Sequence, residues 1–298
     1  MNGAAALFLG VDGGGTGCRA RLEDSSGVVL GLGQSGPATA RLGLSETWDS
    51  VREAFAMAIA EARLEPPDLS RIRAAVGIAG IRRKGIQEQF AALAHPFASL
   101  RFMSDGLIAC LGAHSGKDGG IVIVGTGSIG IARVNGHDLS VGGYGFPISD
   151  EGSGADLGLD AIRLAMRALD GRAEGSPLAT EILGRFHDDP FEVVAWMDRA
   201  TATDCANFAP LVLRYAEQGD SLGRRIVQAG AEKINGLVLA LIERGVPRIA
   251  LIGGMANAIE AWLTPDVRHA LSPPEGDAIS GAIILARQDD GFLKGDSG

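Results

Sequence analysis

The sequence predicts an α/β protein made of two related domains, each built in the order βββαβαβα, with a helical insertion in the second. Three observations support this prediction. Glycine-rich turns follow short apolar runs at matched places in the two halves, strand and helix patterns recur in the same order after each turn, and the second half contains a long helical stretch. Such internal repetition indicates that the architecture is assembled from two copies of one unit.

The first repeat opens with a three-stranded meander. The apolar run 7–12 leads into the glycine turn Gly13 to Thr16, and residues 18–23 then alternate between apolar and polar side chains. This alternation has the period of a strand with one buried face. The turn at 24–27 leads into a third strand at 28–30.

The rest of the first repeat alternates helices and strands. Ser45 is suited to cap a helix whose apolar residues recur at helical spacing, and Pro66 and Pro67 are expected to end it. The remaining elements are expected as a strand at 72–78, a helix at 87–93, a strand at 100–103 and a helix at 106–113.

The second repeat follows the same plan. A strand at 121–124 leads into the glycine turn Gly125 to Ser128, and Asn135-Gly136 is a strong signal for a two-residue hairpin. We expect the first domain to cover residues 1–115 with the closing helix 277–290, and the second to cover 116–276. The later elements are expected as a helical region over 154–244, a strand at 248–252, a helix near Ile259, a short strand near Val267 and a closing helix over 278–287.

Composition restricts the class of partner. A net charge of −9 and a pI near 5.1 argue against a binder of nucleic-acid backbones, so we expect a small-molecule partner. Cys18, Cys110 and Cys205 lie far apart and form no CxxC pair, which indicates neither a disulfide framework nor a zinc site. The sequence shows no basic leader and no apolar run long enough to span a bilayer, so we expect a cytoplasmic protein without a membrane partner.

The two glycine turns are candidate phosphate sites. Glycine lets backbone amides approach an anion without a Cβ in the way, and concave groups of amides bind phosphates. The alternative is that the glycines only tighten hairpins. Two such turns at matched places in a duplicated unit favour the binding of a triphosphate.

Two other nucleotide-binding patterns are excluded. Gly125, Gly127 and Gly130 fit G-x-G-x-x-G after a strand, but that motif needs a helix to open at the turn. The β-branched Ile129 and Ile131 indicate a strand there instead, so we reject a dinucleotide-binding domain. The pattern G-x-x-x-x-G-K-[ST] is absent, which excludes a P-loop.

Acidic residues stand at the ends of predicted strands. Phosphoryl transfer needs acids that position a metal and commonly a base that accepts the proton of the attacking hydroxyl. Asp12 ends the first strand, where a carboxylate can hold Mg²⁺ through water. Asp105 is either the N-cap of the following helix or the base, and its place at a strand end favours the base. Asp150 and Glu151 either cap the helix that follows them or bind sugar hydroxyls.

Four motifs together resemble a known family. Asp12 to Thr16, Gly125 to Ser128, Gly142 to Gly145 and Asp150 to Gly154 are similar to the corresponding segments of bacterial glucosamine kinases and N-acetylglucosamine kinases. These belong to the BadF/BadG/BcrA/BcrD ATPase type within the actin, Hsp70 and hexokinase superfold. The resemblance covers nearly the whole chain, and the ordered set of motifs is more specific than any one of them.

The resemblance implies duplicated ribonuclease H-like (actin-like ATPase) domains that close on Mg·ATP and a sugar. It also implies an ATP-dependent kinase acting on the 6-hydroxyl of D-glucosamine or N-acetyl-D-glucosamine, with glucosamine slightly preferred, and we expect a homodimer. The alternatives are an ATPase that activates a dehydratase through an iron-sulfur cluster, and a non-catalytic sugar sensor. The three scattered cysteines argue against the cluster, which commonly needs four thiolates.

The resemblance also implies residue roles. Asp105 is the expected catalytic base and Asp12 the expected metal ligand. Tyr144 stands where N-acetylglucosamine kinases tend to have Trp, and residues 36–40 lack the Asn that such kinases often carry. The expected nucleotide-binding residues are Asp12, Gly13, Gly14, Gly15, Thr16, Thr126, Gly127, Gly253, Gly254 and Asn257. The expected sugar-binding residues are Thr39, Asp105, Ser128, Gly143, Tyr144, Gly145 and Asp150.

Overall fold

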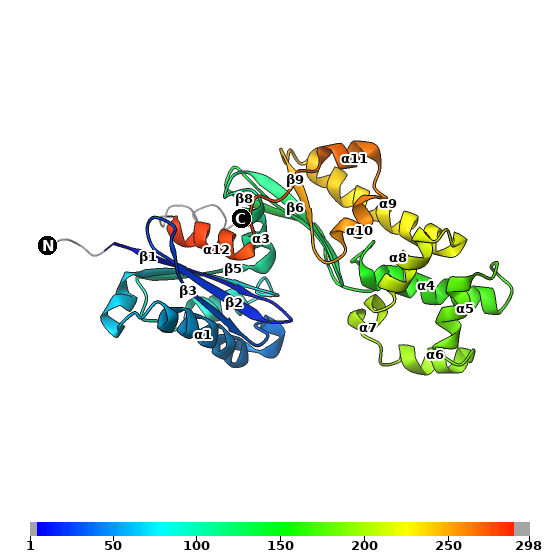
Figure 1. The fold of residues 1–298 in the computed structure, drawn as a ribbon, viewed down its shortest axis with the longest axis horizontal. Coiled ribbons are helices and arrows are strands. Elements are labelled where there is room, and N and C mark those ends of the chain that lie inside the picture. Colours follow the sequence, from blue (N-terminus) through cyan, green and yellow to red (C-terminus); the bar gives the residue numbers. More distant parts are fainter. Residues whose placement is uncertain (1–4, 289–298) are drawn as a thin grey trace. The chain divides into compact units, whose positions relative to one another are not determined.

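The computed structural model describes residues 5–288 (Figure 1). By its internal contacts the chain divides into two compact units. Within the described residues, one unit holds residues 5–119, the segment Ile131–Leu139 and residues 273–288. The other holds Gly120–Gly130 and Ser140–Ser272.

The first sheet confirms the predicted meander and the two strands after it. Its order is β3-β2-β1-β4-β5, in which β1, β2 and β3 are antiparallel while β4 and β5 run parallel to β1. The alternation predicted for the second strand is also confirmed, because Cys18, Ala20 and Leu22 are buried. The strands are β1 (Leu7–Gly13), β2 (Cys18–Glu23), β3 (Val29–Ser35), β4 (Ile72–Ile78) and β5 (Ser99–Ser104).

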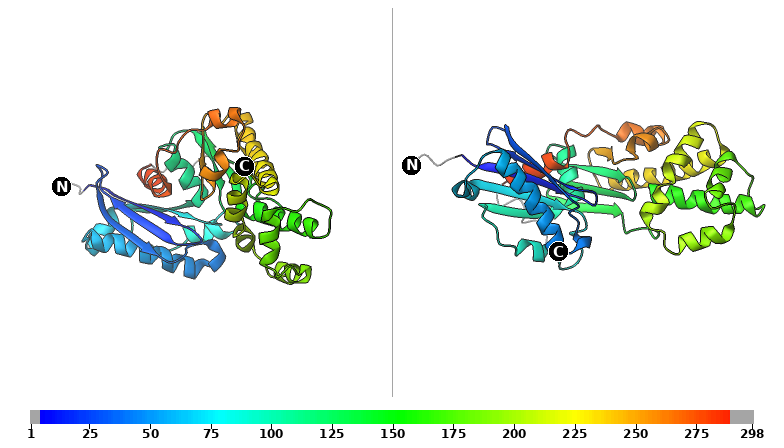
Figure 2. Two further views of the ribbon diagram at one scale, coloured as in Figure 1. Left: turned by 45° about the vertical axis from the view of Figure 1, so that its right-hand side comes forward. Right: turned by 60° about the horizontal axis from the view of Figure 1, so that its bottom comes forward.

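Helices cover both faces of this sheet (Figures 1 and 2). On one face Gly31 and Gly33 let helix α1 approach β3 closely, because a Cβ at Gly33 would lie 1.8 Å from the carbonyl oxygen of Ala54. On the other face α3 and α12 pack against each other, and a Cβ at Gly281 would lie 1.8 Å from the carbonyl oxygen of Ile108. The helices are α1 (Leu44–Glu61), α2 (Ile86–Ala91), α3 (Asp105–Ala113) and α12 (Ala278–Arg287).

Two predicted helix signals in this unit are wrong. Ser45 does not cap α1, which begins one residue earlier at Leu44 with Gly43 at the cap position and no side-chain hydrogen bond there. Pro66 does not end α1 either, because that helix stops at Glu61. Proline is favoured in a first helical turn. Pro66 and Pro67 accordingly open the short 3-10 helix Pro66–Arg71. A second 3-10 helix, Ala40–Leu42, precedes α1.

The second sheet contains the other three-stranded meander. Its order is β8-β7-β6-β9, and β9 runs parallel to β6. Asn135 and Gly136 both have positive φ, 51° and 80°, which confirms the predicted two-residue hairpin turn. The strands are β6 (Gly119–Val124), β7 (Ser128–Val134), β8 (His137–Gly142) and β9 (Ile249–Ile252).

The short strand predicted near Val267 is wrong. Val267 lies in helix α11 (Pro265–Ala270), which begins at a proline and has Asp266 in its first turn and Arg268 in its last. These residues suit the two ends of a helix dipole. Only Leu271 forms an isolated bridge to Ile249, so the second sheet has four strands where the first has five.

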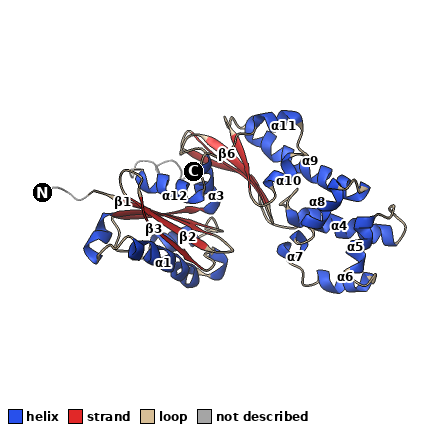
Figure 3. Cartoon of the chain, in the orientation of Figure 1, coloured by secondary structure: helices blue, strands red, loops and turns tan. Residues whose placement is uncertain are grey.

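The predicted helical region is confirmed as an insertion between β8 and β9 (Figures 2 and 3). Its longest helix, α9, contacts α4, α5, α8, α10 and α11. In residues 5–288 no helix is both long enough and apolar enough to cross a bilayer. The helices are α4 (Gly154–Leu169), α5 (Pro177–Gly184), α6 (Pro190–Met197), α7 (Ala202–Ala206), α8 (Ala209–Glu217) and α9 (Ser221–Glu243), followed after β9 by α10 (Ala256–Glu260).

Candidate active site

Asp12 and Asp105 lie at the same edge of the first sheet. The parallel register pairs Asp12 with Gly77 on β4, and it pairs Ile78 of β4 with Ser104 of β5. Asp105 therefore follows immediately after the last paired row, where the carboxyl ends of parallel strands commonly line a ligand site. Gly77 makes room for the start of α3, because a Cβ there would lie 2.2 Å from Cδ1 of Ile108.

The interpretation of Asp105 as a helix cap is wrong. Ser104 is the N-cap of α3, and its hydroxyl oxygen accepts a hydrogen bond from the amide of Leu107 at 3.2 Å. Burial raises the pKa of Asp105, and the negative charge of Asp12 raises it further, against hydrogen bonds from the Gly106 and Asp105 amides that lower it. The carboxylate is thus not needed as a cap, and its raised pKa brings it closer to that of an effective general base.

Asp12 forms an ion pair with Arg19, which faces it in the β1–β2 register. Nη2 of Arg19 donates to Oδ2 of Asp12 at 2.7 Å, and this bond is the main cause of the raised pKa of Arg19. The Arg19 side chain is 56% exposed, whereas that of Asp12 is 19% exposed. The hairpin register could have revealed this pairing from the sequence.

A carboxylate at this position suits Mg²⁺. The ion prefers oxygen ligands, and it is commonly bound through one or two carboxylates with waters and substrate phosphates completing its shell. In the described residues there is no group of three or more His, Cys, Asp or Glu side chains that could hold a metal ion. Asp12 therefore fits a metal held mainly by water and phosphate, and such an ion would compete with Arg19.

The first glycine turn is anchored through its carbonyl groups. The Gly13 carbonyl accepts from the amide of Ala79 at 3.0 Å, and the Gly14 carbonyl accepts from the amide of Ala38 at 2.9 Å. Within the described part of the chain no hydrogen bond is recorded for the amides of Gly15 and Thr16. A turn held by its carbonyls, with amides left over, has the character of an anion-binding nest.

The second glycine turn is anchored in the same way. The Gly125 carbonyl accepts from the amide of Gly154 at 2.8 Å, and the Thr126 carbonyl accepts from the amide of Ala155 at 3.2 Å. These donors are the first two residues of α4, so the helix start fixes the turn. No hydrogen bond is recorded among residues 5–288 for the amides of Thr126 and Gly127.

Close approach explains one glycine in each turn, Gly13 and Gly127, better than hairpin tightening does. None of the glycines from 13 to 17 or from 125 to 127 has a positive φ, so their backbones do not need the freedom that glycine gives. A Cβ at Gly13 would instead lie 3.0 Å from Cβ of Ala38, and one at Gly127 would lie 3.0 Å from Cγ of Asp150.

Asp150 and Glu151 do not cap helix α4. Ser153 occupies the cap position, and its hydroxyl oxygen accepts from the amide of Asp156 at 3.3 Å. Asp150 has a φ of 66°, and its carboxylate lies beside Gly127. The predicted sugar ligand Ser128 is buried, and its hydroxyl donates to the Glu151 carbonyl at 2.7 Å. The structure thus brings Asp150 and Ser128 together at the second glycine turn.

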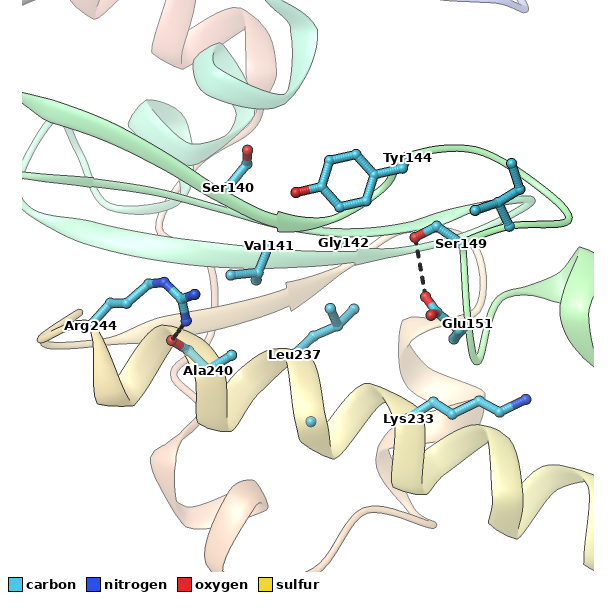
Figure 4. A pocket seen from close by; sticks show the side chains of 12 residues that line it. Ser140, Val141, Gly142, Tyr144, Ser149, Glu151, Lys233, Leu237, Ala240 and Arg244 are labelled. Atoms are coloured by element: carbon cyan, nitrogen blue, oxygen red, sulfur yellow. Dashed lines mark hydrogen bonds between the residues drawn. The ribbon is translucent and has the colours of Figure 1, made fainter. Parts of the chain in front are cut away.

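Gly142, Gly143 and Gly145 take left-handed backbone conformations, with φ values of 67°, 71° and 102°. The intervening Tyr144 is 83% exposed, and its ring lies along the rim of a cavity of about 510 Å³ (Figure 4). The other side is lined by Lys233, Leu237 and Ala240 of α9 and by Arg244, its C-cap residue. The Ser149 hydroxyl donates to Glu151 at 3.2 Å.

A second cavity, of about 450 Å³, lies beside the second glycine turn. Gly125 and Thr126 line it together with Gly154 of α4 and the segment Gly254-Met255 after β9. Gly253 does not line the cavity; its φ of 106° and close packing on the backbone of Val124 fix the segment. The remaining lining residues come from α7, α8 and their junction: Thr203, Ala206, Asn207, Ala209, Pro210 and Leu213.

Two predicted site residues, Asn257 and Thr39, line neither of the two cavities. Asn257 is exposed on α10 and is not among the residues that line the second cavity, whereas Asn207 is. No sequence pattern singled out Asn207, because it lies in the helical insertion. The Thr39 hydroxyl donates to the Ala79 carbonyl at 3.2 Å, and the Thr39 carbonyl accepts from the buried Thr47 hydroxyl at 2.6 Å.

Comparison with known proteins identifies the family. The model of the BadF/BadG/BcrA/BcrD ATPase family matches residues 9–286. The chain belongs to this BadF/BadG/BcrA/BcrD ATPase family. Among curated members, the glucosamine kinase of Vibrio cholerae is 38% identical over 94% of this chain and 95% of its own length. The N-acetylmuramic acid/N-acetylglucosamine kinase of Clostridium acetobutylicum is 27% identical over 94% of this chain and 98% of its own length.

Solved structures confirm the fold class of this BadF/BadG/BcrA/BcrD ATPase family chain. A Chromobacterium violaceum protein provisionally named an N-acetylglucosamine kinase matches with a TM-score of 0.84 and 36% identity, over 95% of this chain and 99% of the other. A ROK-family glucokinase of Streptomyces griseus shares the fold with a TM-score of 0.51 and 19% identity, over 95% of this chain and 100% of its own. The duplicated ribonuclease H-like prediction is therefore confirmed.

Proposed function

We propose that this chain is an ATP-dependent amino-sugar kinase that phosphorylates the 6-hydroxyl of D-glucosamine or N-acetyl-D-glucosamine. The observation that carries the proposal is the position of Asp105. Its carboxylate has a raised pKa and does not cap α3, and it lies at the sheet edge that also holds Asp12 and the first glycine turn. The named activities of the relatives from V. cholerae and C. acetobutylicum support the same class of reaction.

In this mechanism Asp105 accepts the proton of the sugar hydroxyl as that oxygen attacks the γ-phosphate. The amides of Gly15 and Thr16, and those of Thr126 and Gly127, hold the triphosphate. Asp12 would hold Mg²⁺, and this ion would supply positive charge for the phosphates. Because catalysis of phosphoryl transfer rests on positioning and charge, the anchored turns supply what the reaction requires.

The sugar is bound by Asp150 and by the Gly143 and Gly145 backbone, with Tyr144 as an aromatic platform. Thr39 and Ser128 complete the proposed sugar contacts, either through their backbones or by exchanging their present hydrogen bonds. The preference for glucosamine is supported by the higher identity to the glucosamine kinase, 38% against 27%. Gly253, Gly254 and Asn257 remain the proposed adenosine segment.

We also propose that the kinase is a cytoplasmic homodimer, and that its two ribonuclease H-like domains are residues 1–115 with 277–290, and 116–276. Part of 277–290 lies outside the described residues. Size-exclusion chromatography with light scattering tests the dimer. A monomer at micromolar concentration would contradict that part of the proposal alone.

A coupled ADP-release assay tests the function. Glucosamine, N-acetylglucosamine, glucose and N-acetylmuramic acid are each offered with Mg·ATP, and phosphorus NMR then locates the phosphate on the product. We expect glucosamine to give the highest kcat/KM and the phosphate to lie on the 6-oxygen. ADP release that none of the four sugars stimulates would refute the proposal and would leave the sensor alternative.

The dehydratase-activator alternative is not favoured. Such clusters commonly need four thiolates gathered at one site, whereas Cys18, Cys110 and Cys205 lie on three separate elements, β2, α3 and α7. Cys18, Cys110 and Cys205 are all buried, and burial raises the pKa of Cys18 to about 11 and that of Cys110 to about 12. Iron analysis of the purified protein provides an independent check, because stoichiometric iron would favour the activator.

A further inference from the structure

We propose that Asn207 reads the base of the bound nucleotide and gives this kinase a preference for adenine over guanine. The inference rests on the proposed function, because it assumes that a nucleoside triphosphate enters the cavity beside the second glycine turn. Asn207 lies at the C-cap of α7, in the helical insertion between β8 and β9. None of the expected nucleotide-binding or sugar-binding residues lies on helices α4 to α9 of this insertion.

The wall that the insertion contributes to this cavity is largely apolar. Ala206, Ala209, Pro210 and Leu213 line it, and Thr203 and Asn207 are the only polar side chains that the insertion adds. An apolar wall suits the flat faces of a purine, and a few well-placed polar groups then determine the orientation of the ligand. The residues that select the base are therefore expected among these two.

Asn207 is held on a rigid support. Helix α7 begins with a reciprocal capping box, in which the Thr201 amide donates to Asp204 Oδ2 at 2.8 Å and the Asp204 amide donates to Thr201 Oγ1 at 3.3 Å. Its backbone also lies directly against α4, because a Cβ at Gly158 would be 1.9 Å from the carbonyl oxygen of Cys205. The same helix α4 anchors the second glycine turn through Gly154.

The chemistry of the Asn207 side chain favours adenine. Among residues 5–288 the exposed Asn207 side chain has no hydrogen-bond partner, and its amide group offers a donor and an acceptor side by side. This pair matches the amino group and ring nitrogen of adenine, as in bidentate recognition of adenine by Asn in DNA. Guanine presents two acceptors on the same edge, so the Asn oxygen would face another acceptor.

Competition binding tests the inference without depending on turnover. A fluorescent ATP analogue is displaced by ATP or GTP from the wild type, Asn207→Leu, Asn207→Asp and the matched control Gln218→Leu. Gln218 is an exposed amide at the C-cap of α8 and does not line this cavity. A bidentate contact of this kind discriminates by about 5- to 100-fold. We expect Asn207→Leu to bind ATP more weakly by about this factor, while its affinity for GTP changes little. Most of the ATP:GTP preference would then be lost. Asn207→Asp, which keeps an acceptor for the adenine amino group but loses the donor to the ring nitrogen, should weaken ATP binding without improving GTP binding, and Gln218→Leu should match the wild type.

The outcomes separate the two proposals. A wild-type ATP:GTP preference that persists unchanged in both Asn207 variants would overturn the base-reading role while leaving the kinase proposal intact. An equal loss of preference in Gln218→Leu would likewise overturn the base-reading role. A wild type that binds no nucleotide would remove both proposals, and circular dichroism of each variant shows that the fold is retained.

Discussion

Replacing Asp105 with Asn tests the chemical core of the proposed mechanism with little change in shape. Asn keeps the size of the side chain but cannot accept the proton of the sugar hydroxyl. Because Ser104 rather than Asp105 caps α3, the substitution removes no capping hydrogen bond. We therefore expect a folded protein that binds Mg·ATP and sugar but turns over slowly.

The magnitude follows from the environment of the carboxylate. A positioned general base contributes about 100- to 10,000-fold to the rate, equivalent to about 3–5 kcal/mol. The pKa of Asp105 is raised by burial and by Asp12, which makes it a stronger base than an exposed Asp. The loss in kcat is expected in the upper part of that range, with KM values changed little.

Thermal unfolding separates loss of catalysis from loss of structure. An acid whose pKa is raised in the folded state destabilises that state once it is ionised, so stability falls as pH rises through this raised pKa. Replacing the carboxylate with a neutral amide removes this destabilisation. The substitution also removes the favourable interaction of a negative charge with the N-terminus of α3, which contributes at most about 1 kcal/mol. Asp105→Asn should therefore melt no lower than the wild type at neutral pH. Near-normal kcat in a well-folded variant would refute the assignment of the base.

Four further outcomes are expected. The wild-type kcat should fall as pH falls through the raised pKa of Asp105, because the base works deprotonated; a pH–rate profile whose acid limb lies at or below the ordinary Asp value of about 3.9 would contradict this. Arg19→Met should lower the half-saturating Mg²⁺ concentration by up to about five-fold, which is the contribution of an exposed ion pair. A magnesium titration that shows no decrease would count against competition between Arg19 and Mg²⁺ for Asp12. Gly127→Ala places a methyl group 3.0 Å from the Asp150 carboxyl and should raise the sugar KM by about ten-fold, whereas Gly125→Ala, whose methyl would meet no atom within 4 Å, should leave the sugar KM unchanged. Gly112→Ala places a methyl group 1.9 Å from the Asp277 carbonyl oxygen and should lower the free energy of unfolding in urea by about 1–3 kcal/mol, while Gly184→Ala, in open space, should cost nothing.

The sequence predicted those parts of the fold that depend on local patterns. Alternation in 18–23 and the Asn135-Gly136 pair are short-range signals, and both gave the correct structure. Capping depends on side-chain geometry that several neighbouring polar residues can satisfy. Ser104 therefore took the place considered for Asp105, and Ser153 the place considered for Asp150 or Glu151.

The candidate site was predictable only where a motif marks it. The two glycine turns stand in the sequence next to apolar strands, so their anchoring could be anticipated. Asn207 and Thr203 come to the cavity through the packing of α7 on α4, which depends on Gly158 meeting the backbone of Cys205. A close approach between segments that are distant in sequence leaves no periodic signal, so these residues could not be found from the chain alone.

The two repeats differ in the features that their proposed roles require. The first repeat keeps a fifth strand, and that strand delivers Asp105 to the edge beside Asp12. In the second repeat the corresponding segment is reduced to the bridge at Leu271, so no strand end there presents an acid. The second repeat instead carries the helical insertion, whose helices line the cavity beside the glycine turn. In the proposed mechanism the first repeat therefore supplies the two acids, Asp12 and Asp105, and the second supplies the wall of the nucleotide cavity.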